Sequence, residues 1–254
     1  MLSGIDRAVT SDPLLPFSPG CISAVLVRRE KRFLAECELP TGRFYAHTNN
    51  TGSMRGLLNP GSPVFLSPAA GGTRKLPWTL EMIGLTSNSA SGERIAWVGV
   101  NTLTPNRLLR TAFQAGLLPW AQGYDSLRPE VRRRESRIDA LLSGPGMPPL
   151  WVECKNVTMV EGDAAAFPDA PSLRGHKHLR EMASIAASGE RAVFFYCVQR
   201  QDGNLFAPAA TIDPEYARLF YEAAAAGVEC RPHRARLSEA GISLGEELPV
   251  KPES

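Results

Sequence analysis

The segment ESRIDALLSGPGMPPLWVECKNV, residues 135–157, decides how the second half of this 254-residue chain folds. Two runs in it, Glu135–Ser143 and Leu150–Asn156, have the composition of strands, and the Gly/Pro-rich stretch between them predicts a turn. Because alternate side chains of a strand lie on the same face, Glu153 and Lys155 are expected to point the same way. The segment therefore predicts a strand–turn–strand unit with a charged face.

The first strand carries charge with the same period. Glu135, Arg137 and Asp139 are expected to share one face. The other face is expected to carry three apolar residues, Ile138, Ala140 and Leu142. If the two strands pair so that their charged faces coincide, Asp139 comes close to the charged residues of the second strand.

Asp139, Glu153 and Lys155 then form a candidate catalytic group. Carboxylate oxygens are good ligands for Mg²⁺ (or Mn²⁺), an ion that usually keeps several waters and completes its shell with phosphate oxygens. A lysine beside such an ion can hold the attacking water or the phosphate. We therefore expect Asp139 and Glu153 as metal ligands and Lys155 as the water-positioning group. The alternative is an ordinary Glu–Lys pair on a solvated sheet face with an unrelated Asp nearby.

These segments resemble a known nuclease core. Ser136–Asp139 and Val152–Asn156 resemble the D…E-x-K motif of the PD-(D/E)XK nuclease superfamily. The wider chain, roughly residues 20 to 245, resembles the SfsA (sugar fermentation stimulation protein A) family within it. The matching segments are, in chain order, His47–Met54, Arg74–Trp78, Val98–Thr102, Pro105–Leu108, Val160–Gly162, Phe167–Ala170 and Arg174–Leu179.

The resemblance implies an OB-like N-terminal barrel that binds nucleic acid and a nuclease-like C-terminal domain. It implies nonspecific DNA binding more firmly than cleavage. Family members tend to carry acidic residues just after the segment that matches Pro105–Leu108, whereas this chain has Arg110 and Thr111. Nuclease folds of this class often take one more acidic metal ligand from that helix. The source of such a ligand is therefore open here, and Glu135 is a candidate substitute.

The residue pattern itself predicts a mixed α/β chain with two domains. A leader, residues 1–20, precedes about five short strands between turn signals in residues 21–90, which predict a small closed barrel of the OB type. Residues 91–245 alternate helices and strands and predict an α/β domain with a mixed central sheet. The strand at residues 93–101 is expected to cross into that domain, and residues 246–254 are expected to be a polar tail.

Helix boundaries are predicted from capping residues. Thr104 is expected to cap the first helix, with Pro105 at its first position. Ser172 is expected to cap a second helix that ends before Gly189, and Asp213 a third.

Basic residues gather locally although the net charge is only +2. OB-type barrels bind single strands through a basic groove with stacking aromatic side chains. The candidate nucleic-acid contacts combine these basic residues with the polar turn at residues 49–54, and they are Arg28, Arg32, Asn50, Thr51, Arg55, Arg74, Arg107, Arg137, Arg174 and Lys177. A solvated surface is the ordinary alternative for each of them.

Other function classes find no support in the sequence. Five widely spaced cysteines without a C-x-x-C pair indicate free thiols in a reducing compartment. The chain shows no signal-peptide pattern and no apolar run of membrane-spanning length, so we expect a cytoplasmic protein without a membrane partner. It lacks G-x-S-x-G, P-loop, dinucleotide-binding and H-E-x-x-H motifs.

The leading hypothesis is a Mg²⁺-dependent nuclease that acts on DNA or RNA. A second hypothesis is a non-catalytic DNA-binding or regulatory protein of sugar metabolism that retains a nuclease fold. A third is a metabolic or structural protein whose barrel binds another protein. The sequence leaves open the polymer, its strandedness, endo- or exonucleolytic action, sequence specificity and a homo-oligomeric state.

Overall fold

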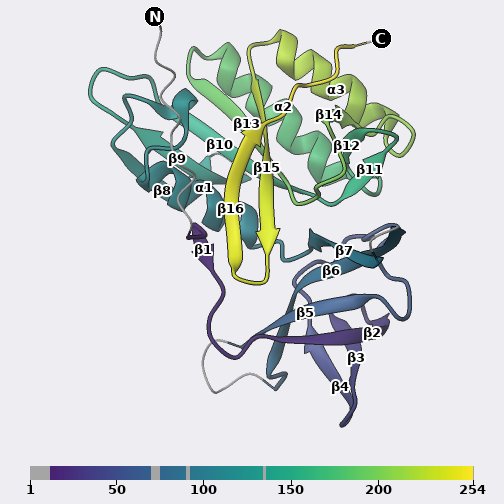
Figure 1. The fold of residues 1–254 in the computed structure, drawn as a ribbon. Helices are drawn as coiled ribbons and strands as arrows, with labels where there is room; N and C mark the ends of the chain where they lie inside the picture. Colours follow the sequence, from purple (N-terminus) through teal and green to yellow (C-terminus); the bar gives the residue numbers. More distant parts are fainter. Residues whose placement is uncertain (1–11, 70–74, 90–91, 134–135, 254) are drawn as a thin grey trace, which may run out of the picture.

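The computed structural model describes residues 12–69, 75–89, 92–133 and 136–253. A β-barrel and an α/β domain lie one above the other, with the barrel at the bottom of the view in Figure 1. The strands are β1 Leu15–Pro16, β2 Ile22–Glu30, β3 Leu34–Leu39, β4 Gly42–His47, β5 Pro63–Pro68, β6 Trp78–Ser89, β7 Gly92–Gly99, β8 Ser126–Arg133, β9 Ser136–Ser143, β10 Leu150–Val157, β11 Met159–Glu161, β12 Ala164–Phe167, β13 Arg191–Val198, β14 Leu205–Pro208, β15 Glu229–Ser238 and β16 Gly241–Glu247. The helices are α1 Thr104–Gln114, the short 3-10 helix η1 Pro119–Ala121, α2 Leu173–Ala187 and α3 Pro214–Ala225.

The N-terminal sheet closes into the predicted barrel. Its strand order is β4-β3-β2-β5-β6-β7, and a parallel contact between His47 of β4 and Thr79 of β6 closes the first five strands. Leu26, Leu66 and Leu80 are fully buried inside, as expected where alternate residues of each strand face the interior. The OB-like five-stranded barrel predicted from the short strands is confirmed.

β7 differs from its prediction. The strand expected to cross into the second domain instead pairs with β6 from Gly92 to Gly99, in antiparallel register with Met82–Ser89. Its alternating pattern finds a partner in the long β6, which extends beyond the closed barrel, so the N-terminal sheet continues to Gly99. The connection to α1 is therefore short and runs from Val100 to Leu103.

The C-terminal domain is built on a mixed seven-stranded sheet of order β1-β16-β15-β13-β10-β9-β8. β10, β13 and β15 are parallel, and the other pairs are antiparallel. Both faces of β13 are buried, which explains why residues 192–198 are a continuous apolar run rather than an alternating one. A small sheet, β11-β12-β14, lies beside it.

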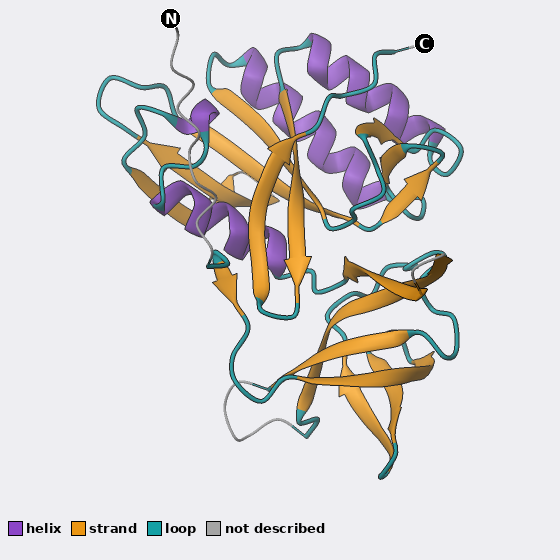
Figure 2. Ribbon diagram, viewed as in Figure 1, coloured by secondary structure: helices purple, strands orange, loops and turns teal. Residues whose placement is uncertain are grey.

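Helices cover both faces of this sheet (Figure 2). On one face, Met182 of α2 and Phe220 of α3 pack against Phe194 and Tyr196 of β13. On the other face, the apolar stripe of α1 packs against the residues of β13 that alternate with these, such as Phe195. The predicted mixed α/β layer arrangement is confirmed. No helix in the described ranges is long and apolar enough to span a membrane.

Two of the three predicted helix caps are confirmed. The Ser172 side chain accepts a hydrogen bond from the Gly175 N–H at 2.9 Å, and the Asp213 carboxylate accepts one from the Tyr216 N–H at 2.9 Å. The Thr104 cap is wrong by one residue, because Leu103 occupies the cap position and Thr104 is the first helical residue.

The two ends of the chain pack more closely than predicted. Leu15–Pro16, placed in the leader by sequence, pairs with Ile242–Gly241 of β16. Beyond β16, the predicted polar tail runs beside β14, where the Lys251 N–H donates to the Phe206 carbonyl at 2.8 Å. Leu248 is buried there. The composition predicts a polar tail, but two apolar residues, Leu248 and Val250, and the free backbone groups of β14 hold it in place.

Asp213 is predicted to be a large contributor to stability. It is 4% exposed, caps α3, accepts the Ser172 N–H at 2.9 Å and contacts His176 Nε2 through both oxygens. We expect Asp213→Ala to lower the free energy of unfolding at pH 7 by about 2–4 kcal/mol, measured by urea denaturation. The matched change is Asp163→Ala, because Asp163 is exposed. A loss equal to that of the control would contradict the prediction.

The stability lost in Asp213→Ala is also predicted to depend on pH. Burial would raise the pKa of Asp213, but the Ser172 and Tyr216 N–H groups and His176 outweigh burial and lower it. A carboxylate with a lowered folded-state pKa stabilises the fold above its unfolded pKa of about 3.9 and stops doing so below the folded value. The stability difference between wild type and Asp213→Ala should therefore shrink as the pH falls below about 4.

Candidate active site

β9 and β10 pair as the sequence predicts, but only along part of their length. Their antiparallel register runs from Leu142 opposite Leu150 to Ala140 opposite Val152. At the next residue of β9, a side chain bonds to the backbone of β10. Asp139 Oδ2 accepts a hydrogen bond from the Cys154 N–H at 2.8 Å. The strands thus separate at the level of Asp139, and its carboxylate is fixed beside Glu153.

The strict alternation predicted for β9 also stops there. Ala140 and Leu142 pack on the α1 side of the sheet, whereas Ile138 belongs to the core on the α2 side. The difference coincides with an irregularity in the neighbouring strand β8, where Glu130, between the partners of Ala140 and Ile138, has a φ of 52°. A positive φ interrupts the pleat, so residues before and after it do not keep one face.

A cavity of about 470 Å³ opens at this separation. Both domains contribute to its wall, with Asn50 and Thr51 from the loop after β4 and the remaining residues from the α/β domain. The polar and charged residues that line it are Asn50, Thr51, Thr102, Asn106, Asp139, Glu153, Lys155, Asn156, Thr158, Asp169, Arg174 and His178. The structure therefore brings the three predicted catalytic residues together in one interdomain cavity.

Glu153 is a buried carboxylate with two cationic or hydrogen-bonding neighbours. It is 4% exposed, accepts from Lys155 Nζ at 2.8 Å, and makes a short contact with His178 Nδ1. Burial would raise the pKa of Glu153, but Lys155 and His178 outweigh burial and lower the pKa to about 2. Glu153 is therefore ionised at neutral pH although it lies in the protein interior.

The hydrogen bonds around His178 define its tautomer. Arg174 Nε donates to His178 Nε2 at 3.4 Å, which requires that this nitrogen carries no proton. The ring proton then resides on Nδ1 and is donated to Glu153. Lys155 Nζ lies 3.0 Å from the same Nδ1, so Glu153, Lys155 and His178 form one closed cluster.

Asp139 lies in a different electrostatic environment. Burial and the nearby Glu153 charge raise the pKa of Asp139, and the hydrogen bonds from Cys154 and Asn106 oppose that shift. The Asn106 bond, at 3.0 Å, brings α1 into the site through an amide rather than a carboxylate. The two acids of the cavity thus differ in how readily they ionise.

A carboxylate of the α/β domain holds the barrel loop over the cavity. Asp169 Oδ2 accepts from Ser53 Oγ and from the Met54 N–H, both at 2.9 Å. Arg29 of β2 donates to the Gly52 carbonyl at 2.8 Å and fixes the loop from the barrel side. Asn50 Oδ1 accepts the Gly52 N–H, so the polar turn predicted at residues 49–54 is a rigid part of the wall.

The predicted nucleic-acid contacts fall into separate places. Asn50, Thr51 and Arg174 line the cavity. Arg107 lines a second cavity, and Arg137 borders a small space that Glu153 and His178 also border.

The remaining predicted contacts lie elsewhere or beyond the described ranges. Arg28 forms ion pairs with Glu30 and Glu36 on the barrel. Arg32, Arg55 and Lys177 are exposed and line none of these three spaces. Arg74 and Glu135 lie outside the described residues, so neither can be placed.

His178, Asn106 and Asp169 are absent from the candidate site residues, although all three lie in segments that carry the family resemblance. His178 had a usable signal, because it lies four residues after Arg174 and so on the same side of α2. Its neighbour in sequence, His176, turns away to Asp213. Asn106 and Asp169 are ordinary polar residues whose roles arise from contacts with distant segments.

Comparisons with known proteins agree with this two-part arrangement. Residues 27–92 match the model of the SfsA N-terminal OB domain, and residues 103–241 match that of the sugar fermentation stimulation protein RE domain. The chain belongs to the SfsA family. Two relatives, both named sugar fermentation stimulation protein homolog, come from Lawsonia intracellularis and Maridesulfovibrio salexigens. The first is 46% identical over 93% of this chain and 97% of its own length, the second 49% over 94% and 98%.

A solved structure has the same fold. SfsA from Pyrococcus furiosus, determined in complex with Ca²⁺, superposes with a TM-score of 0.83 at 28% identity. The match covers 94% of this chain and 99% of the other. Both the barrel and the curled mixed sheet are therefore features of the SfsA fold.

Removal of Lys155 is predicted to destabilise the fold through Glu153. The side chains of the pair are 11% and 5% exposed, so Lys155→Met leaves a buried carboxylate without its closest cation. We expect the free energy of unfolding at pH 7 to fall by about 3 kcal/mol. In the double variant Lys155→Met/Glu153→Gln, much of that loss should return, because the orphaned charge is gone. Lys251→Met, at an exposed position, is the control. Additive losses in the double variant would contradict this account.

Proposed function

We propose that this SfsA protein binds nucleic acid between its two domains and hydrolyses phosphodiester bonds with a divalent cation, Mg²⁺ or Mn²⁺. The observation that carries the proposal is the convergence of Asp139, Glu153 and Lys155 in one polar cavity. Their resemblance to the D…E-x-K motif gives the reaction class. Asn50 and Thr51 of the barrel loop line the same cavity, which supports a role for the barrel in holding the nucleic acid.

The acids of the cavity fit a hard cation. Within the described ranges, no group of three His, Cys, Asp or Glu side chains is arranged to enclose a metal. Mg²⁺ does not need such an enclosure, because one or two carboxylates usually hold it while waters and substrate phosphates complete its shell. Asp139 and Glu153 each retain acceptor capacity beyond the hydrogen bonds described above. The Ca²⁺ bound by the Pyrococcus furiosus relative supports a divalent-cation site in the family.

Each residue of the cavity then has a distinct role. Asp139 and Glu153 would hold the cation, which when bound would supply an acidified water and offset charge on the phosphoryl oxygens. Lys155 has a donor beyond its bond to Glu153 and can hold the attacking water or a phosphate oxygen. His178 keeps Glu153 oriented and ionised, and Arg174 lies at the rim where a neighbouring phosphate can pair with it.

Cleavage is tested directly on the purified protein. We expect Mg²⁺-dependent cleavage of DNA or RNA, single- and double-stranded substrates being assayed side by side. Asp139→Ala and Lys155→Ala should each lower the rate at least about 100-fold, since each removes a group that stabilises developing charge. Asp163→Ala and Lys251→Ala, at exposed positions, are the matched controls. Activity that survives both active-site substitutions would show that the site is assigned wrongly.

A non-catalytic DNA-binding role is the second candidate, and one observation favours it. Helix α1 contributes only the Asn106 amide to the cavity, and Arg110 and Thr111 stand where the resemblance leads one to expect another acid. Tight binding without cleavage by any of Mg²⁺, Mn²⁺ or Ca²⁺ would favour this role over catalysis.

Binding itself is predicted to depend steeply on salt. Contacts between cationic side chains and phosphates release counterions, so affinity falls linearly with salt on logarithmic scales. Arg174→Ala should reduce the magnitude of that slope by about one. Arg180→Ala is the control, because Arg180 lies on the same helix and pairs with Glu215 at 3.0 Å. An unchanged slope for Arg174→Ala would remove Arg174 from the interface.

A further inference from the structure

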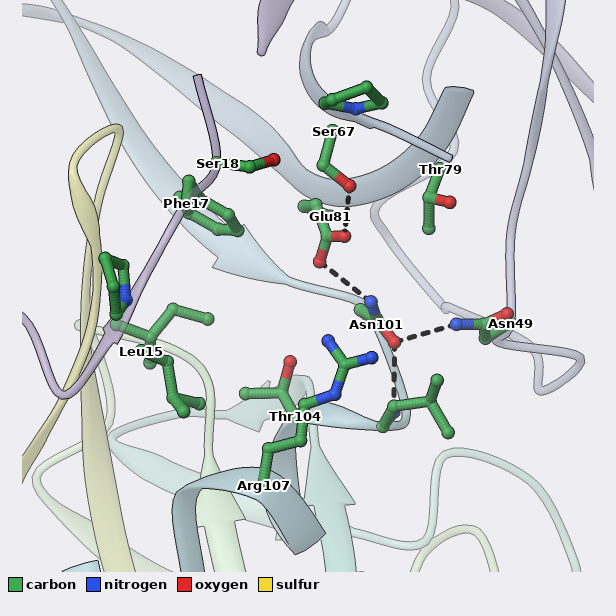
Figure 3. Close-up of a pocket in the computed structure, with 14 residues that line it drawn as sticks. Leu15, Phe17, Ser18, Asn49, Ser67, Thr79, Glu81, Asn101, Thr104 and Arg107 are labelled. Carbon is green, nitrogen blue, oxygen red and sulfur yellow. Dashed lines mark hydrogen bonds between the residues drawn. The ribbon is translucent and has the colours of Figure 1, made fainter. Parts of the chain in front are cut away.

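A second cavity, of about 510 Å³, lies where the N-terminal segment, the barrel and the start of α1 meet (Figure 3). Its volume is within the range of small-molecule sites, roughly 300–1,000 Å³. It adjoins the candidate active site through successive residues. Asn49, Asn101 and Arg107 line this cavity, whereas their neighbours Asn50, Thr102 and Asn106 line the other.

One wall is polar and carries a buried carboxylate. Glu81 of β6 is 7% exposed and accepts from Ser67 Oγ at 2.6 Å and from Asn101 Nδ2 at 2.8 Å. Both of these donors are neutral, so they do not cancel its charge. Each carboxylate oxygen can accept a second hydrogen bond. Glu81 is therefore suited to receive a hydroxyl or amino group of a ligand.

The polar wall is held rigid by Asn101, which is 2% exposed. Its Oδ1 accepts from Asn49 Nδ2 at 2.9 Å and from the Leu103 N–H at 3.0 Å, while its Nδ2 donates to Glu81. These dashed bonds in Figure 3 join the barrel to the first turn of α1. A ligand would therefore meet groups that are already fixed, which reduces the entropy lost on binding.

A cation lies on the opposite side of the cavity. Arg107 is exposed, and in Figure 3 its guanidinium extends into the cavity toward Glu81 and Asn101. Across the described part of the chain, its side chain forms neither a hydrogen bond nor an ion pair. Guanidinium groups bind phosphate through paired hydrogen bonds, so an unpaired one in a concave site is suited to an anionic group.

The cavity also has an apolar surface. Phe17 is half-buried and contacts Phe65, with ring centroids 5.1 Å apart. Leu103, directly before α1, leaves 48% of its surface exposed at the cavity. A ligand with a flat, weakly polar body would cover this surface.

We propose that this cavity binds one nucleotide. Its phosphate pairs with Arg107, its base packs against Phe17 and Leu103, and its amino or hydroxyl groups donate to Glu81. The nucleotide is either a free nucleoside monophosphate or an unpaired nucleotide of the strand held in the neighbouring cleft; the second source rests on the proposed function. In that case the substrate is single-stranded near the cleavage point, since a duplex keeps its bases stacked and paired.

The first experiment measures binding without metal, so that no cleavage is involved. The full-length protein in EDTA is titrated with deoxyadenosine monophosphate and with inorganic phosphate by calorimetry. We expect the nucleotide to bind at least about 10-fold more tightly than phosphate, and Arg107→Ala to weaken it about 10-fold or more. Arg110→Ala, an exposed arginine one turn further along α1 that does not line the cavity, should change nothing.

A second variant tests the carboxylate. Glu81→Gln should weaken binding of the nucleotide and not of inorganic phosphate, because the amino and hydroxyl groups proposed to reach Glu81 while the phosphate pairs with Arg107 belong to the base and sugar. Thermal melting shows whether each variant is folded. A nucleotide that binds no more tightly than phosphate, or equal effects of Arg107→Ala and Arg110→Ala, would overturn the proposal.

Competition then separates the two sources. If deoxyadenosine monophosphate displaces a labelled 12-nucleotide oligothymidylate, the site belongs to the strand; if both bind together, it is a site for the free nucleotide. The Asp139→Ala variant keeps this proposal distinct from the proposed nuclease function, because it removes a residue needed for cleavage but none that lines the second cavity. Absence of cleavage together with Arg107-dependent nucleotide binding leaves this site standing, whereas cleavage without nucleotide binding removes only this site.

Discussion

The site depends on keeping one carboxylate ionised inside the protein. Glu153 lies in the middle of a sheet covered on both faces, where burial opposes its charge. Lys155, two residues along the same strand, compensates that charge, and His178, from α2, donates a hydrogen bond to the same carboxylate. The contact between Glu153 and His178 also sets where the first turns of α2 lie over β10. Arg174, on the same turns, is carried to the rim of the cavity as a consequence.

The second constraint is the attachment of the barrel. Asp169 binds Ser53 and Met54 across the cavity, and Gln199 at the end of β13 accepts the Gly99 N–H through its carbonyl at 3.1 Å. A side chain at Gly99 would collide with Gln199, whose Oε1 lies 2.0 Å from an ideal Cβ position. A larger residue at position 99 would therefore require the Gln199 side chain to move. Since Asn50 and Thr51 come from the barrel, neither domain alone contains the complete cavity.

Two adjoining cavities lie between the barrel and the α/β domain, and they differ in their side chains. The first gathers the acids and Lys155, and the second offers Arg107, Glu81 and an apolar surface. Consecutive residues of the loop after β4 and of the first turn of α1 separate them. Under the proposed function, a nucleic acid held at the first cavity would meet the second within a short stretch, and the interdomain contacts set the spacing between the two cavities.

Local sequence patterns were sufficient to predict many of the elements and part of the candidate site. Strand alternation gave β9 and β10 and brought Asp139, Glu153 and Lys155 together, and the capping residues Ser172 and Asp213 located α2 and α3 within a residue. These features depend on neighbours in sequence or on a single pair of strands. Local pattern failed where a distant segment supplied the partner. β7 joined β6 because that strand was long enough to receive it, and the end of the chain packed beside β14, whose backbone groups were free.

By itself, the sequence determined most of the elements, the charged face of the central strands and the acids proposed as cation ligands. The tertiary structure decided that His178 and Asn106 complete the site, that Arg28 pairs with acids on the barrel, and that Arg107 faces a cavity of its own. The reason is physical. A side chain's backbone position follows from local periodicity, whereas its charge state and partner depend on which remote groups the packed domains bring within hydrogen-bonding distance.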